Sequence, residues 1–236
     1  MKDPGGCFIA GTLVHTKEGL KSIEEIKVGD YVLSMPEDGN SEQAYKRVTK
    51  TLQFKEKEVW CVEICPKSEV EQAKREHRLI RQESAFKLIV TPNQPFWVEG
   101  MGWTRVDGLF HTSSEHLPQL ILSDGEIAMA FWAAPMKRSE RSNAAWAPAP
   151  DGFDGSYFST GMHVDLTQGG RSAEFGYLPS RTGSMHDDNG GVDVWKPENI
   201  YRCTVYNLEI EDFHTYYVGT RGVWVHNQNC VIYYTK

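Results

Sequence analysis

Short apolar runs dominate the chain. Most contain about four to eight residues, and Gly, Pro, Asn or Asp bounds them. Runs of this length with turn residues between them are typical of β-strands. The pattern predicts an all-β fold, with strands near residues 11–16, 31–35, 58–65, 86–91, 95–100, 102–106, 119–125, 126–134, 202–211, 215–220 and 222–227.

Two segments depart from this pattern. Residues 68–84 are highly charged and form either a short helix or a mobile loop between two strands. Residues 136–197 are rich in Gly, Ser, Pro, Asn and Asp, which predicts a long irregular insertion, because loops of this length are uncommon inside a compact domain. The insertion either recognises a partner or is a variable loop without a separate role. We expect it to be partly ordered around Trp146, Phe153, Tyr157, Phe158 and Phe175.

Composition excludes several classes of protein. The chain has 236 residues, of which 40% are hydrophobic, so it can bury a large core. The net charge of -7 argues against a nucleic-acid partner, because binding to phosphate usually requires a basic surface. No apolar run approaches the roughly 18 residues of a membrane helix, so no membrane partner is expected.

The five cysteines do not resemble a disulfide framework, because their number is odd in a chain of this size. Cys61 and Cys65 are separated by three residues but lack a second Cys/His pair nearby. Cys61 also lies in an apolar run, where a buried thiol packs well. We therefore predict no metal and no cofactor.

Candidate chemistry gathers at the two ends of the chain. Cys7 follows two glycines, and a thiolate is a good nucleophile when a carbonyl is held against it. Gly6 has no side chain, which allows other groups to approach its carbonyl. At the other end, an apolar strand leads directly into His226 and Asn227.

Three motifs in order resemble the Hint domain, the fold shared by Hedgehog proteins and inteins. The segment CFIAGTLV, followed by GDYVLS, resembles the first block; LIVTPNQPFWV resembles the second; and TVYNLEIEDFHTYYVGTRGVWVHN resembles the last two. The amino-acid sequences of these motifs are most similar to those of Hint domains in bacterial intein-like proteins and polymorphic toxins. The resemblance covers residues 7 to about 110 and about 200 to 227, and it implies a β-horseshoe that brings both chain ends to one cleft.

The resemblance implies a first step at Cys7. The thiol would attack the Gly6 carbonyl and convert the amide into a thioester, with Thr91 donating a hydrogen bond. A histidine three residues after Thr91 would act as the general acid. This chain has Gln94 there, which can form hydrogen bonds but cannot transfer a proton at neutral pH. His15, His111 and His116 are candidates to substitute for it, although each is more simply a surface or strand-edge residue.

The resemblance also implies a second step at Asn227. Its side-chain amide would attack its own carbonyl, form a succinimide and break the bond to Gln228. His214 and His226 match the two histidines that supply protons in this family, and histidine can hold or give a proton near neutral pH. Asn207 stands where inteins often carry Asp, but a structural turn or strand-edge role is the simpler explanation for it.

The residue after Asn227 argues against protein splicing. Ligation requires Cys, Ser or Thr at that position, whereas this chain has Gln228, and Cys230 lies two residues too far along. The sequence therefore predicts cis autoproteolysis at Asn227–Gln228, a single-turnover reaction that releases a C-terminal, toxin-like segment. A non-cleaving Hint scaffold or interaction module is the alternative that Gln94 favours.

The predicted organisation has three parts. Residues 1–6 are an N-terminal flank, residues 7–227 form the Hint domain, and residues 228–236 begin a C-terminal flank. The expected partners are the chain's own flanking segments and a downstream toxin domain. The resemblance implies a bacterial protein made in the cytoplasm as part of a larger precursor, and the sequence leaves the final location open.

Overall fold

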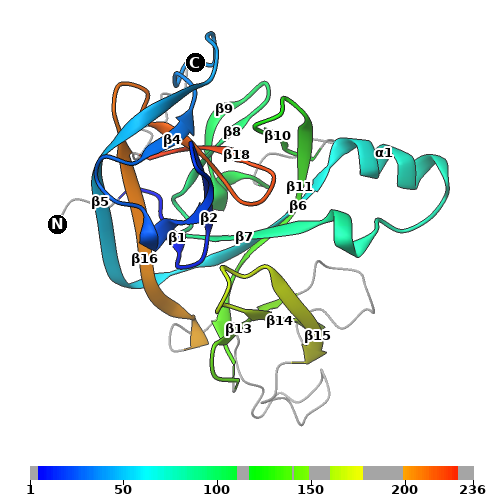
Figure 1. Ribbon diagram of the computed structural model, residues 1–236. Coiled ribbons are helices and arrows are strands. Elements are labelled where there is room, and N and C mark those ends of the chain that lie inside the picture. Colours follow the sequence, from blue (N-terminus) through cyan, green and yellow to red (C-terminus); the bar gives the residue numbers. More distant parts are fainter. Residues whose placement is uncertain (1–4, 111–116, 140, 149–159, 178–198, 228–236) are drawn as a thin grey trace, which may run out of the picture.

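A computed structural model describes residues 5–110, 117–139, 141–148, 160–177 and 199–227 (Figure 1). In these ranges the regular secondary structure is almost entirely β-strand. The strands of its first half are β1 (Phe8–Ile9), β2 (Leu13–Thr16), β3 (Gly19–Ser22), β4 (Tyr31–Ser34), β5 (Ala44–Glu58), β6 (Trp60–Pro66), β7 (Phe86–Val90), β8 (Pro95–Val98) and β9 (Gly102–Arg105). Those of the second half are β10 (Gln119–Ile121), β11 (Ile127–Pro135), β12 (Lys137–Arg138), β13 (Ala144–Pro148), β14 (Thr160–Asp165), β15 (Ser172–Tyr177), β16 (Arg202–Ile210), β17 (Thr215–Val218) and β18 (Val223–His226).

The larger sheet nearly closes on itself. Its hydrogen-bonded order is β10-β11-β6-β7-β1-β16-β5-β4-β2-β17-β18-β8-β9, β3 pairs with β2, and β10 also pairs with β8. This closure protects the strand edges. The closed sheet surrounds one apolar core, which includes Phe8, Val32, Phe96, Tyr216 and Val225. The predicted all-β class is therefore confirmed, and strands from both ends of the chain lie in one sheet (Figure 1).

Strand β5 is absent from the predicted strands. It extends over 15 residues and pairs with β16 from Ile210 to Arg202. Its sequence is dominated by Lys, Glu, Thr and Gln, and Val48 is its only buried residue. The apolar pattern is therefore too weak to reveal it, because pairing with β16 and not burial makes this segment a strand.

The segment expected to be an irregular insertion differs from that expectation. Its described parts form a second, antiparallel sheet in the order β12-β13-β14-β15, below the larger sheet in Figure 1. Trp146 is fully buried, and Gly161 makes room for its ring, since a Cβ at Gly161 would lie 2.6 Å from ring atoms. Polar turn residues in this segment hid the strands from the apolar pattern. Phe153, Tyr157 and Phe158 lie outside the described residues.

A second apolar cluster joins the two sheets. The larger sheet and its edge contribute Cys7, Ile9, Val59, Cys61 and Ile89 to this cluster. Residues 136–164 contribute Met136, Ala145, Ala147 and Val164. The insertion therefore covers the side of the larger sheet on which Cys7 lies. No disulfide joins Cys7, Cys61, Cys65 and Cys203 to one another.

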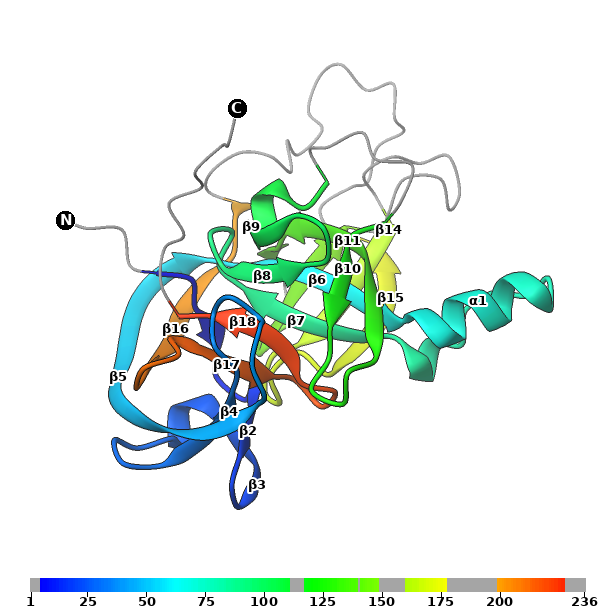
Figure 2. The same ribbon diagram turned by 90° about the horizontal axis from the view of Figure 1, so that it is seen from above.

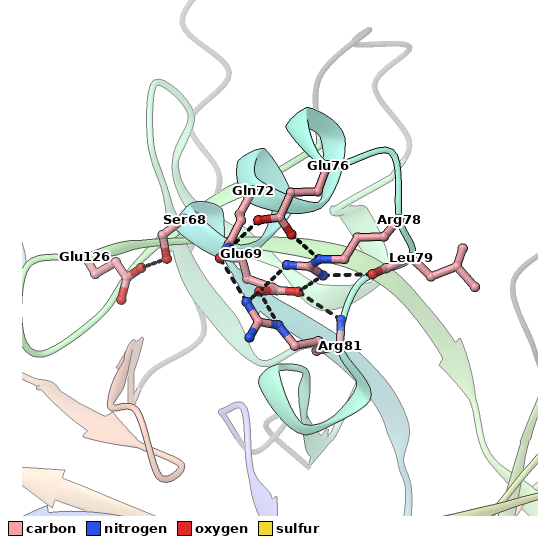
Figure 3. A network of polar contacts seen from close by, with 8 residues as sticks. All are labelled: Ser68, Glu69, Gln72, Glu76, Arg78, Leu79, Arg81 and Glu126. Carbon is pink, nitrogen blue, oxygen red and sulfur yellow. Dashed lines mark hydrogen bonds and ion pairs between the residues drawn. The ribbon is translucent and has the colours of Figure 1, made fainter.

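Residues 68–84 include a helix and not only a loop. Helix α1 (Lys67–Arg75) projects from the body of the molecule (Figure 2), and a 3-10 turn, η2 (Gln82–Ser84), follows it. Glu69 holds this arm together: its carboxylate accepts hydrogen bonds from the Arg78 and Arg81 side chains and from the Arg81 amide (Figure 3). The Arg78 guanidinium, helped by Arg81, lowers the pKa of Glu69 to about 2.

The remaining helical turns are short. They are η1 (Ile23–Glu25) and η3 (Val106–Gly108). Within the described ranges, no helix is both long and apolar enough to cross a membrane.

Candidate functional site

Strand β18 carries His226 and Asn227 into the interior. It pairs with β17 through Thr215 and His226 and with β8 through Val225 and Phe96. All four of its residues are buried, as the apolar sequence predicts, so the strand is held from both sides. His226 is 5% exposed and Asn227 is 6% exposed.

Strand β1 brings Cys7 to the same region. Phe8 pairs with Tyr206 of β16 and with Val90 of β7. By this register, Cys7 lies next to Asn207 of β16 and to Thr91, which follows β7. Segments from both halves of the chain thus meet: Cys7 before β1 and the end of β7 lie beside β16, the turn that follows it and the end of β18.

At the N-terminal junction, Cys7 and Thr91 bind each other. The Cys7 amide donates to Thr91 Oγ1 over 2.9 Å, and the Thr91 amide donates to the Cys7 carbonyl over 2.9 Å. Thr91 Oγ1 is therefore an acceptor in this contact, and its own O–H, the predicted donor, is a separate group. The Cys7 thiol donates to the Gly5 carbonyl over 3.2 Å, one residue before the carbonyl that it would attack.

Gln94 lies between the two ends of the chain. Its Nε2 donates to the carbonyls of Pro95 and His226, each over 3.0 Å. Both N–H groups of the side chain are thus engaged, and neither is directed at the Gly6 carbonyl. Its Oε1 is buried and accepts no hydrogen bond from any described residue. Gly6 packs tightly against Gln94, since a Cβ at Gly6 would lie 2.4 Å from both Gln94 Cα and Oε1.

At the C-terminal junction, Asn207 contacts the carbonyl that cyclisation would attack. Its Nδ2 donates to the Asn227 carbonyl oxygen over 2.7 Å. Its Oδ1 accepts from the Leu208 amide over 2.7 Å and from the Tyr216 hydroxyl over 2.8 Å. Because two donors hold Oδ1, the amide nitrogen must face Asn227. Burial, with Cys7 alongside, raises the pKa of Tyr216 well above its usual value, so its hydroxyl remains a donor.

The two predicted histidines lie beside Asn227. The Asn227 amide donates to the His214 carbonyl over 3.0 Å, and His214 Nδ1 is buried with no hydrogen-bond partner among the described residues. His214 has a φ of 54°, and such left-handed backbone costs roughly 1–3 kcal/mol and often marks a functional site. Burial lowers the pKa of His226; Glu37 acts in the opposite direction, and His214 adds to the lowering.

Other predicted residues lie elsewhere. His15 binds the Gly219 carbonyl over 3.0 Å, in the turn that precedes β18. This turn lies at the opposite end of the β17–β18 hairpin from His226, whose carbonyl Gln94 binds, so His15 is remote from the position of the missing histidine. His111, His116, Gln228 and Cys230 lie outside the described residues. Across the described part of the chain, no group of three or more His, Cys, Asp or Glu could hold a metal ion.

Three residues of the site were not identified as functional from the sequence. Asn207 had a signal, since it stands where inteins often carry Asp, but a structural role was the simpler explanation. Tyr216 and Glu37 had none: one is an aromatic residue in an apolar run, and the other is an acidic residue in a polar turn. Their side chains acquire their roles from the strands and loops beside them.

No family model and no curated protein sequence matches the chain. Its structure is similar to that of a bacterial intein-like domain from Clostridium thermocellum, with a TM-score of 0.50 and 19% identity over 94% of this chain and 98% of that one. It is also similar to the gp41-1 intein (TM-score 0.47, 14% identity, 94% and 99% covered) and to a DnaB intein from Synechocystis (TM-score 0.46, 10% identity, 95% and 99% covered).

The first of these similarities defines the class of fold. The chain has the all-β Hint fold of intein-like domains, as its motifs predicted.

Proposed function

We propose that this domain cleaves its own chain at Asn227–Gln228 by cyclisation of Asn227, and that it releases the segment that follows. One observation carries the proposal: Asn207 Nδ2 donates to the Asn227 carbonyl oxygen over 2.7 Å, in a buried site. Negative charge develops on this oxygen when a nucleophile attacks its carbon. A preorganised N–H aimed at it therefore stabilises the transition state.

The step balances within the chain. Asn227 Nδ2 forms a bond to its own carbonyl carbon, and the bond from that carbon to the Gln228 nitrogen breaks. A proton leaves Nδ2, and a proton reaches the departing amine. His214 and His226 flank Asn227 and are the groups suited to move these protons. The products are a C-terminal succinimide and a new N-terminus at Gln228.

The geometry of the N-terminal junction favours a thioester step at Cys7 that is slow or absent. Both N–H groups of Gln94 bind carbonyls other than that of Gly6, and the Cys7 thiol faces Gly5. With no nucleophile at position 228, cleavage without ligation is the outcome that this arrangement favours. The released segment would be a toxin-like domain if the resemblance to polymorphic-toxin Hint domains extends to the flanks.

The test places the domain between two tags and follows the fragments by gel and mass spectrometry over hours. The parent is expected to release the C-terminal tag and leave a fragment lighter by one water than the product of hydrolysis. Asn227→Ala is expected to release none. Equal release by the two proteins would overturn cyclisation, and an intact parent would instead support the non-cleaving scaffold.

A further inference from the structure

The loop between β4 and β5 lies against the C-terminal site. The Glu37 carbonyl accepts a hydrogen bond from Trp103 Nε1 over 2.9 Å, and the Gly39 amide closes a turn on the Pro36 carbonyl over 2.9 Å. Gly39 has a φ of 70°, and a Cβ there would lie 3.5 Å from the Trp224 ring. The loop is therefore a defined turn packed on tryptophans of β9 and β18.

Glu37 extends from this turn to His226. Its Oε2 lies 2.9 Å from His226 Nε2. The Glu37 side chain is 59% exposed, whereas that of His226 is 6% exposed. The carboxylate therefore stays in contact with water, while the imidazole ring is buried. The Trp103 ring packs edge-on against the imidazole, with ring centroids 4.9 Å apart and planes at 77°. Glu37 and Trp103, which also bind each other, thus hold the ring from two directions.

Within the described ranges, two titratable groups act on His226. Glu37, from the β4–β5 loop, favours the protonated ring, and His214, from the β16–β17 turn, opposes it. Trp103 from β9 packs on the ring, Thr215 of β17 pairs with the His226 backbone, and the Gln94 amide binds the His226 carbonyl; none of these side chains titrates near neutral pH. Among the described residues, Glu37 is therefore the carboxylate whose charge acts on this histidine.

We propose that Glu37 is a positioning residue that orients the His226 ring and stabilises its protonated form for cleavage at Asn227–Gln228. This inference rests on the proposed function. A carboxylate bound to one ring nitrogen fixes the orientation of the imidazole and stabilises the imidazolium, as in hydrolytic triads. His226 then carries a proton for the departing amine at a higher pH than burial alone would allow.

The consequence is a pH dependence with a defined sign. Cleavage that uses protonated His226 slows as pH rises through the pKa of this histidine. Glu37→Gln removes the charge that raises this pKa, so the falling limb of the profile moves to lower pH. The expected movement is up to about one pH unit, at the low end of the range for an adjacent charge because Glu37 is largely exposed. Near neutral pH the rate of release falls by up to about tenfold.

The experiment has two measurements and a matched control. Asp38→Asn makes the same change of charge one residue away, on a carboxylate whose hydrogen bond is to the Asn40 amide. First, the rate of C-terminal release is measured against pH for the parent, Glu37→Gln and Asp38→Asn. Second, the pKa of His226 is measured by NMR for the same substitutions in an Asn227→Ala background, which does not cleave.

The expected result is a lower His226 pKa and a shifted profile for Glu37→Gln alone. An unchanged His226 pKa in Glu37→Gln, or an equal shift in Asp38→Asn, would overturn the inference. The NMR measurement needs no cleavage. A parent that fails to cleave therefore counts against the proposed function, while the titration still decides whether Glu37 acts on His226.

Discussion

The two junctions of this domain are built from neighbouring strands but differ in where their hydrogen bonds point. At the C-terminal junction, Asn207 donates to the carbonyl oxygen of Asn227. At the N-terminal junction, Gln94 donates to Pro95 and His226, and the Cys7 thiol donates to Gly5. The Asn227 carbonyl therefore has an N–H donor directed at it, while the Gln94 amide at the other junction binds carbonyls other than that of Gly6.

Two junctions in one region of a fold therefore need not present the same hydrogen-bond geometry to their carbonyls. Gln94 fills the space against Gly6 and connects it to β18, which is a structural role. Asn207 is oriented by Tyr216 and Leu208, which leaves its amide nitrogen for the Asn227 carbonyl. A side chain supports chemistry only when its other hydrogen bonds orient it toward the reacting atom.

The largest expected effect comes from removing the donor at Asn207. Asn207→Ala is expected to slow release of the C-terminal tag by about 10²–10³-fold, the usual cost of losing one such donor. Release is measured by densitometry at fixed pH, and circular dichroism checks that the variant folds. Asn40→Ala, on the exposed β4–β5 loop, is the control. A rate within twofold of the control would contradict the role assigned to Asn207.

The second prediction concerns a substitution at position 94 that makes the N-terminal junction more like the C-terminal one. Gln94→His introduces a general acid beside Gly6, so thiol-induced release of the N-terminal tag is expected to rise by about tenfold or more. The measurement adds a small thiol and follows the N-terminal fragment over time. Gln53→His, on the exposed face of β5, introduces a histidine away from the site. If both variants react at the parental rate, Gln94 is not what limits the Cys7 step.

The smallest effect tests how Asn207 is oriented. Tyr216→Phe removes one of the two donors to Asn207 Oδ1, so C-terminal release is expected to slow by about fivefold and stability to fall by about 1 kcal/mol. Tyr217→Phe on the same strand is the control, because its hydroxyl binds Gln43 instead. Rates and unfolding midpoints in urea are compared. Equal rates for the two variants would show that Leu208 alone orients Asn207.

Strand pairing explains why some features could be predicted from the sequence and others could not. The run from Gly222 to Val225 predicted β18 and the position of Asn227, because apolar β-prone residues bury themselves in most contexts. By contrast, the polar sequence of β5 and the turn-rich sequence of the second sheet concealed their strands. Those segments form strands because neighbouring strands hydrogen-bond to them.

Local pattern and residue chemistry were enough to predict the all-β class, the order of the motifs and the candidates Cys7, His226 and Asn227. Asn207 faces the Asn227 carbonyl, the Gln94 N–H groups bind carbonyls other than that of Gly6, and Glu37 reaches His226, and these contacts follow from the tertiary structure alone. A side-chain amide or carboxylate can bind many partners. Which one it binds depends on the strands and loops that folding places within about 3 Å of it.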